Sequence, residues 1–167
     1  MHFLASFLPF YKGLVGILAH RISSSESQVV LTDGDTEALV YLRENVELNK
    51  KGGGGDISCT QLIWGRNTSL AFLKQQNEEK FDILLASDIV YSPVIIQPLW
   101  ETIQTLLEPS GIFVMAYARR KVPVSIDEVL TAAEKFGFEY EKCQESDDDK
   151  GIFVYFFQWK DRHSEEL

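Results

Sequence analysis

The sequence is poor in basic residues and in cysteine. Sixteen lysines and arginines stand against 25 aspartates and glutamates in 167 residues, which leaves a net charge of −9. A general nucleic-acid binder needs a basic face, so this balance argues against one. The two cysteines, Cys59 and Cys143, lie far apart without the spacing of metal ligands. They indicate reduced thiols in a cytoplasmic protein, with the nucleus as the alternative.

Long apolar runs are also missing. No stretch approaches the roughly 20 apolar residues of a transmembrane helix, so we expect no membrane partner. Residues 1–21 have the composition of a signal peptide, but no basic region precedes their apolar part, and Pro9 and Lys12 interrupt it. We therefore interpret this segment as part of the fold. The three histidines are scattered and adjoin no acidic or cysteine cluster, so we assign no metal site and no catalytic triad.

Short apolar runs typical of buried strands alternate along the chain with longer segments whose apolar residues recur at helical spacing. This alternation predicts an α/β fold: a Rossmann-like, mainly parallel sheet with helices on both faces and a C-terminal antiparallel hairpin. We expect a single domain over residues 1–160 and a frayed tail over 161–167. The expected strands are 28–32, 57–63, 81–87, 112–118, 138–143 and 152–159, and the expected helices begin near residues 12, 35, 69, 96 and 125.

The first of these helices, over about 12–22, is predicted to be amphipathic. Its proposed apolar stripe consists of Leu14, Ile17, Leu18 and Ile22.

Two acidic residues follow predicted strands directly. In open α/β sheets, ligands bind at the carboxyl ends of the strands, so Asp33 and Asp88 would stand at a binding edge. A carboxylate at the position of Asp33 could accept hydrogen bonds from both hydroxyls of a ribose. Its alternative role is to cap the next helix, which Asp35 can also do. Tyr91 lies three residues after Asp88, just before a turn at Pro93.

Three further features are open or carry no function. Trp64 could stack on an adenine or could belong to the core, and its spacing favours neither. The KKGGGGD segment over 50–56 runs from a helix to a strand, which is the wrong context for a phosphate loop. The basic segment 119–121 is interpreted as a solvated turn rather than an anion site.

Four short segments occur in a characteristic order. They are GLVGILA at 13–19, LTDGD at 31–35, LIWG at 62–65 and ASDIVY at 86–91. Together they resemble motifs of the class I S-adenosylmethionine-dependent methyltransferases, and within them the small protein-lysine methyltransferases of the family 16 type. The resemblance covers most of the predicted domain but does not identify the substrate.

The resemblance implies a function and a set of site residues. It implies S-adenosylmethionine as cofactor, a lysine-containing protein as substrate and a monomeric enzyme. Asp88 would orient the incoming ammonium, and Tyr91 would wall the lysine channel. The implied cofactor-binding residues are Gly13, Asp33, Trp64 and Ser87. The alternatives are a non-catalytic binding module and a methyltransferase acting on another kind of substrate.

The N-terminal segment departs from this family. If Gly13 is the last glycine of the family's glycine-rich loop, the two earlier glycines fall on Pro9 and Tyr11. Residues 1–12 then look like an atypical replacement for the first strand and this loop, as in an N-terminally truncated member. The apolar run 2–8 could still serve as the first strand. We expect the first 22 residues to be the weakest part of the fold and cofactor affinity to be poor.

Overall fold

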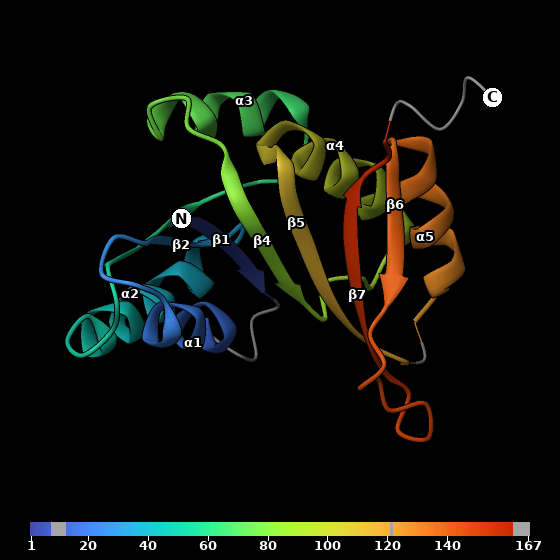
Figure 1. The fold of residues 1–167 in the computed structure, drawn as a ribbon, viewed down its shortest axis with the longest axis horizontal. Coiled ribbons are helices and arrows are strands. Elements are labelled where there is room, and N and C mark those ends of the chain that lie inside the picture. The colour runs from blue at the N-terminus through green and yellow to red at the C-terminus, as the bar shows by residue number, and fades with distance from the viewer. Residues whose placement is uncertain (8–12, 121, 162–167) are drawn as a thin grey trace.

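The structure is a computed structural model that describes residues 1–7, 13–120 and 122–161 (Figure 1). Its strands form one seven-stranded sheet in the order β3-β2-β1-β4-β5-β7-β6. Neighbouring strands from β3 to β5 are parallel, and β7 runs antiparallel to both β5 and β6. The predicted fold class is therefore confirmed. The strands are β1 (His2–Phe7), β2 (Gln28–Asp33), β3 (Asp56–Gln61), β4 (Phe81–Ser87), β5 (Leu107–Ala118), β6 (Phe138–Lys142) and β7 (Ile152–Trp159).

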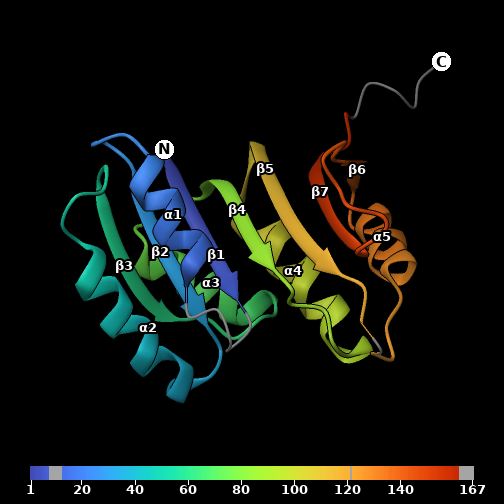
Figure 2. The same cartoon turned by 90° about the horizontal axis from the view of Figure 1, so that it is seen from below.

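The helices lie on both faces of this sheet. Figures 1 and 2 show α1 (Leu14–Ile22) and α2 (Thr36–Asn49) on one face, over β1–β3. The other face carries α3 (Arg66–Gln75), α4 (Ile96–Leu106) and α5 (Ile126–Lys135). A single 3-10 turn, Pro93–Ile95, precedes α4. A capping box between Ser125 and Glu128 is present at the start of α5.

The N-terminal strand occupies the middle of the sheet. β1 pairs in parallel with β2 on one side and with β4 on the other, and Leu4 and Ala5 are buried. The apolar run near the N-terminus therefore serves as the first strand, as the sequence suggested. Pro9 and Tyr11, where the sequence departs from the glycine pattern, lie outside the described residues.

The larger core lies on the side of α3, α4 and α5. The fully buried Trp100 of α4 lies at its centre and contacts Phe113, Phe138 and Phe157, with ring centroids 5.0 to 5.8 Å away. Aromatic side chains contribute large apolar areas, so this cluster fastens α4 to the C-terminal half of the sheet. A smaller core under α1 and α2 includes Leu39, Leu42 and Val46 of α2.

The apolar stripe predicted for α1 is wrong at three of its four positions, and only Ile17 packs against the core. Leu14, Leu18 and Ile22 are 51%, 52% and 86% exposed, whereas the helix buries Gly16, Ala19 and His20. A Cβ atom at Gly16 would lie 2.8 Å from Cγ of Leu31, so α1 approaches the sheet too closely for a larger residue there. The small residues Gly16 and Ala19 therefore make the closest approach to the sheet, and Leu14, Leu18 and Ile22 turn outward.

One face of the sheet is covered over only part of its width. On the side of α1 and α2, no described helix packs over β5 and β7, and α1 makes only a few contacts with β4 (Figure 2). Ile83, Leu85, Ile112 and Val114 remain partly exposed there. With Phe3 and Phe156 they line an apolar groove of about 490 Å³ beside Ala19 and Ile22 of α1.

The glycine-rich loop between α2 and β3 packs against α1. The Gly54 N–H donates a hydrogen bond to the His20 carbonyl at 2.9 Å. A Cβ atom at Gly53 would fall 1.9 Å from the His20 ring, so this contact excludes any side chain at that position. The glycines thus have a packing role in the fold.

Several kinds of feature are missing from the residues that the structure describes. None of the helices is both long enough and apolar enough to cross a membrane within 1–7, 13–120 and 122–161. The same residues contain no cluster of three or more His, Cys, Asp or Glu side chains suited to a metal ion. Both cysteines are free.

Hydrogen exchange measures how firmly β1 is held. Because β1 is paired on both sides, its amides should exchange only when the sheet opens as a whole. Contrary to the weakness expected from the sequence, this pairing predicts that residues 3–6 are protected as strongly as residues 83–87 of β4 when exchange is followed by NMR or mass spectrometry. Fast exchange at 3–6 with retained protection at 83–87 would instead show that β1 detaches by itself, and the expected weakness of the N-terminal segment would then be real.

Candidate functional site

The predicted site residues gather at one edge of the sheet. The parallel strands β3, β2, β1, β4 and β5 all end at this edge (Figure 2). Asp33 is the last residue of β2, Ser87 is the last residue of β4, and Asp88 follows at once. Trp64 lies just beyond the end of β3. The carboxyl edge therefore brings together residues that are up to 55 positions apart in the sequence.

Backbone contacts hold Asp33 beside the segment that contains Trp64. The Leu62 N–H donates to the Asp33 carbonyl at 3.0 Å, and the Gln61 side-chain amide donates to the Gly34 carbonyl at 2.9 Å. Asp35 caps α2 by accepting a hydrogen bond from the Glu37 N–H at 2.8 Å. The helix cap is therefore provided by Asp35, as the sequence suggested.

The carboxyl group of Asp33 is half-buried. Its Oδ1 accepts a hydrogen bond from the Asp35 N–H at 2.9 Å. Burial raises the pKa of Asp33 above its ordinary value, while hydrogen bonds from the Asp35 and Gly34 backbone oppose this shift. A carboxylate that is partly desolvated in this way gains from additional hydrogen-bond donors, such as the hydroxyls of a ribose.

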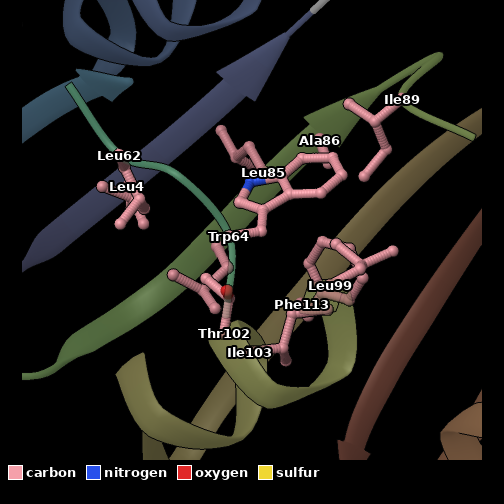
Figure 3. A pocket seen from close by; sticks show the side chains of 11 residues that line it. Leu4, Leu62, Trp64, Leu85, Ala86, Ile89, Leu99, Thr102, Ile103 and Phe113 are labelled. Carbon is pink, nitrogen blue, oxygen red and sulfur yellow. The ribbon is translucent and has the colours of Figure 1, made fainter. Parts of the chain in front are cut away.

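Trp64 lies over the end of β4. Its ring stands beside Ala86 and Ile89 and borders a small apolar cavity of about 30 Å³ (Figure 3). The side chain is half-buried and packs against the larger core. This packing is compatible with a core role and leaves part of the side chain exposed at the carboxyl edge. Adenine binding by Trp64 stays a prediction.

The segment after Trp64 is fixed by α4. The Gly65 N–H donates to Oγ1 of Thr102 at 2.9 Å, and the Arg66 N–H donates to Oε2 of Glu101 at 3.2 Å. Two neighbouring side chains of α4 thus bind the start of α3. The sequence reasoning missed this support, because the partners lie more than 30 residues apart.

Asp88 is buried at a constrained position. Its φ is +58°, a left-handed conformation that is uncommon for residues other than glycine. Its N–H donates to the Ala116 carbonyl of β5 at 2.8 Å, and its side chain is 10% exposed. Ile89 and Val90 are buried and anchor the same loop, whereas Tyr91 is 50% exposed. The loop thus presents an aromatic ring to solvent three residues from a buried carboxylate.

Arg120 forms an ion pair with Asp88, through its Nη2 and the Asp88 Oδ2. Arg119 and Arg120 are exposed, as the interpretation of 119–121 expected, but that interpretation missed the ion pair of Arg120, and Lys121 lies outside the described residues. Apart from Arg120, no residue in the described part of the chain offers a donor to Oδ2. The order of the strands could have predicted the pair, because Arg120 follows β5 and Asp88 follows the neighbouring strand β4.

Gly13 stands at the start of α1. Its φ is +87°, and its carbonyl accepts the first helical hydrogen bond, from the Ile17 N–H at 2.9 Å. A Cβ atom there would lie 2.4 Å from Leu42 and 2.6 Å from Leu31, so both conformation and packing require glycine. Ser87 is half-buried at the end of β4. Cofactor contacts by Gly13 and Ser87 stay predictions.

Comparison with known proteins agrees with the family motifs at this edge. The family model described as lysine methyltransferase matches residues 12–135. The chain belongs to this family. A calmodulin-lysine N-methyltransferase of Arabidopsis thaliana is 24% identical over 129 residues, which cover 77% of this chain and 40% of that protein. This chain spans between 31% and 64% of the length of the curated relatives that it matches.

Solved structures show the same fold. A TehB-like S-adenosylmethionine-dependent methyltransferase from Corynebacterium glutamicum superposes with a TM-score of 0.64 at 16% identity, covering 95% of this chain and 80% of that one. An O-methyltransferase from Bacillus cereus, solved with S-adenosylhomocysteine, also gives a TM-score of 0.64, at 15% identity, with 95% and 74% of the two chains covered. The fold is thus that of S-adenosylmethionine-dependent methyltransferases.

Substitution of Asp33 separates binding from stability. Because folding raises the pKa of this carboxyl group, its contribution to stability is greatest below the unfolded pKa and is lost as the pH rises through the folded pKa. At pH 7.5 the ionised group therefore opposes folding, and Asp33→Asn should leave the melting temperature equal to or above that of the wild type. Loss of charge-assisted hydrogen bonds to a ribose, at about 1.5–3 kcal/mol, should weaken S-adenosylhomocysteine binding about 10- to 100-fold in calorimetry.

Asp56→Asn provides the control, because Asp56 is exposed at the opposite end of β3. Unchanged affinity in Asp33→Asn would exclude a ribose contact. A large drop in its melting temperature would show a structural role for the carboxylate.

Proposed function

We propose that this chain carries a methyltransferase site that moves a methyl group from S-adenosylmethionine to a lysine side chain of a protein. Membership in the lysine methyltransferase family supports the reaction class. The observation that carries the proposal is Asp88, a buried carboxylate at the carboxyl edge that already holds a cationic side chain. The ammonium group of a lysine substrate is also a cation and could bind the Asp88 carboxylate in the same way.

The residues at the edge are suited to the cofactor. Asp33 offers a partly desolvated acceptor for the ribose hydroxyls, and Trp64, held beside it, offers an aromatic face for adenine. Gly13 lies at the start of α1, and Ser87 is the last residue of β4. When bound, the cofactor supplies an electrophilic methyl group on a sulfonium. Because these contacts come from three different strand ends, the proposed site depends on the whole sheet.

The chain's own residues would orient the lysine. Asp88 accepts the ammonium group and aligns it, and the exposed ring of Tyr91 borders its path and can hold the cation against its face. The ammonium must first give a proton to water, since only the neutral amine has a lone pair. The nitrogen then bonds to the methyl carbon while the carbon–sulfur bond breaks, and sulfur keeps that electron pair. No strong base on the protein is needed.

The alternative is a non-catalytic binding module, motivated by Pro9 and Tyr11 in place of loop glycines. It would retain the carboxyl edge and a protein partner without turnover. A methyltransferase with another substrate would turn over but label a different group. Hydrolysis of labelled protein and identification of the methylated amino acid distinguishes these cases.

The purified chain should bind S-adenosylhomocysteine in calorimetry and transfer labelled methyl groups from S-adenosylmethionine to lysines of a cell lysate. Asp88→Asn should reduce methyl incorporation about 100-fold, because the ammonium is no longer aligned. Its affinity for S-adenosylhomocysteine should stay within about threefold of the wild type. Asp56→Asn again serves as the control and should behave as the wild type in both measurements.

Absence of heat at high micromolar S-adenosylhomocysteine would rule out cofactor binding by this chain. Binding without any methyl incorporation would favour the non-catalytic module. Full activity in Asp88→Asn would remove Asp88 from the reaction.

A further inference from the structure

The Asp88–Arg120 pair lies where two neighbouring loops leave the sheet. Asp88 follows β4 by one residue, Arg120 follows β5 by two, and these parallel strands are adjacent. The Asp88 N–H to Ala116 carbonyl hydrogen bond, at 2.8 Å, continues the pairing of the strands past the end of β4. The backbone thus fixes the carboxylate, whereas Arg120 reaches it through a long side chain.

The two partners differ in burial. The Asp88 side chain is 10% exposed and the Arg120 side chain 46% exposed, so the guanidinium connects the buried carboxylate with solvent. A buried carboxylate without a compensating cation is strongly unfavourable. A group that displaces Arg120 must therefore bring a positive charge and N–H donors of its own.

The neighbouring arginine is held differently. The Arg119 N–H donates to the Gly151 carbonyl at 2.7 Å, and the Arg119 guanidinium lies 5.2 Å from the centre of the Phe153 ring. Arg119 is thereby attached to β7 and the loop before it. The two arginines share charge and sequence context, but Arg120 is the one that pairs with Asp88.

From these observations we propose that Arg120 is a cationic placeholder: its guanidinium occupies the Asp88 carboxylate until a primary ammonium group displaces it. The proposal rests on the proposed function, because the ammonium is that of the lysine substrate. Arg120 acts as a gating and specificity residue and takes no part in the chemical step.

The exchange has two consequences for the reaction. Neutral side chains cannot displace the guanidinium, since they would leave Asp88 uncompensated, so the pair selects for cations. After methyl transfer the methylated ammonium leaves, Asp88 again lacks a cation, and the return of Arg120 restores the pair. Competition between Arg120 and the substrate therefore raises the KM for lysine without changing cofactor binding.

The exchange can be measured with n-butylammonium as a probe of the lysine side chain. The Asp88 carboxyl signal and the Arg120 Nε–H signal are followed by NMR during titration at pH 7.5 and constant ionic strength. In the wild type, n-butylammonium should move the Arg120 signal towards that of a free arginine, and tetramethylammonium, which lacks N–H donors, should not. Arg120→Gln should bind n-butylammonium about three- to tenfold more tightly than the wild type.

Arg119→Gln is the matched control, since it removes the same charge one residue away and should bind n-butylammonium as the wild type does. Equal or weaker binding by Arg120→Gln, in a variant with an unchanged melting temperature, would overturn the proposal. If Arg120→Gln fails to fold, the wild-type titration decides: an Arg120 signal that n-butylammonium leaves in place would overturn it equally.

The same variants separate this proposal from the proposed function. If Arg120→Gln lowers the KM for lysine methylation and leaves kcat and S-adenosylhomocysteine affinity unchanged, both are supported. A lower kcat at constant KM would indicate a structural role for Arg120. Exchange at Asp88 without S-adenosylhomocysteine binding would instead leave a cation site in a chain that does not perform the proposed reaction.

Discussion

The pairing of β1 with both β2 and β4 is the constraint on which the rest of the structure depends. A parallel sheet without its middle strand would expose two rows of unpaired backbone groups. The short apolar segment His2–Phe7 supplies these hydrogen bonds and buries Leu4 and Ala5 between the two layers of helices. With β1 between them, β2 and β4 end at the same carboxyl edge, and the residues that follow them lie along that edge.

The binding properties of the carboxyl edge depend on how deeply its two carboxyl groups, those of Asp33 and Asp88, are buried. Asp33 is half-buried, with a raised pKa, and faces the proposed ribose position. Asp88 is buried more deeply, in a left-handed backbone conformation, and is compensated by Arg120. Two equally exposed carboxylates would bind the same kinds of partner. Asp33 and Asp88 differ in burial and in their hydrogen bonds, and they therefore favour different partners.

The two faces of the sheet are unequally built. The face under α3, α4 and α5 has a continuous aromatic core around Trp100, whereas α1 and α2 cover β1–β3 and leave an apolar groove over β4 and β5. Ile22 of α1 is exposed and lines this groove. The candidate site is at the carboxyl edge, so its geometry is set by the strand ends and by the contacts of α4 rather than by the half-covered face.

The sequence by itself determined the fold class, most element boundaries and which of the candidate residues follow strands. Apolar runs, capping residues such as Asp35 and Ser125, and short motifs are local signals, and local signals survive without tertiary context. They failed for the buried side of α1, because apolar spacing names Leu14, Leu18 and Ile22 but cannot show that close packing against Leu31 requires glycine at position 16.

Only the tertiary structure decided which residues distant in the sequence contact one another. The sequence placed Asp88 after a strand but could not show that Arg120, 32 residues further along, reaches it, because that contact depends on β5 pairing with β4. The binding of Gly65 and Arg66 by Thr102 and Glu101 has the same origin. Such contacts join residues through the order of strands and the packing of helices, and this order is settled by burial and backbone pairing over the whole sheet.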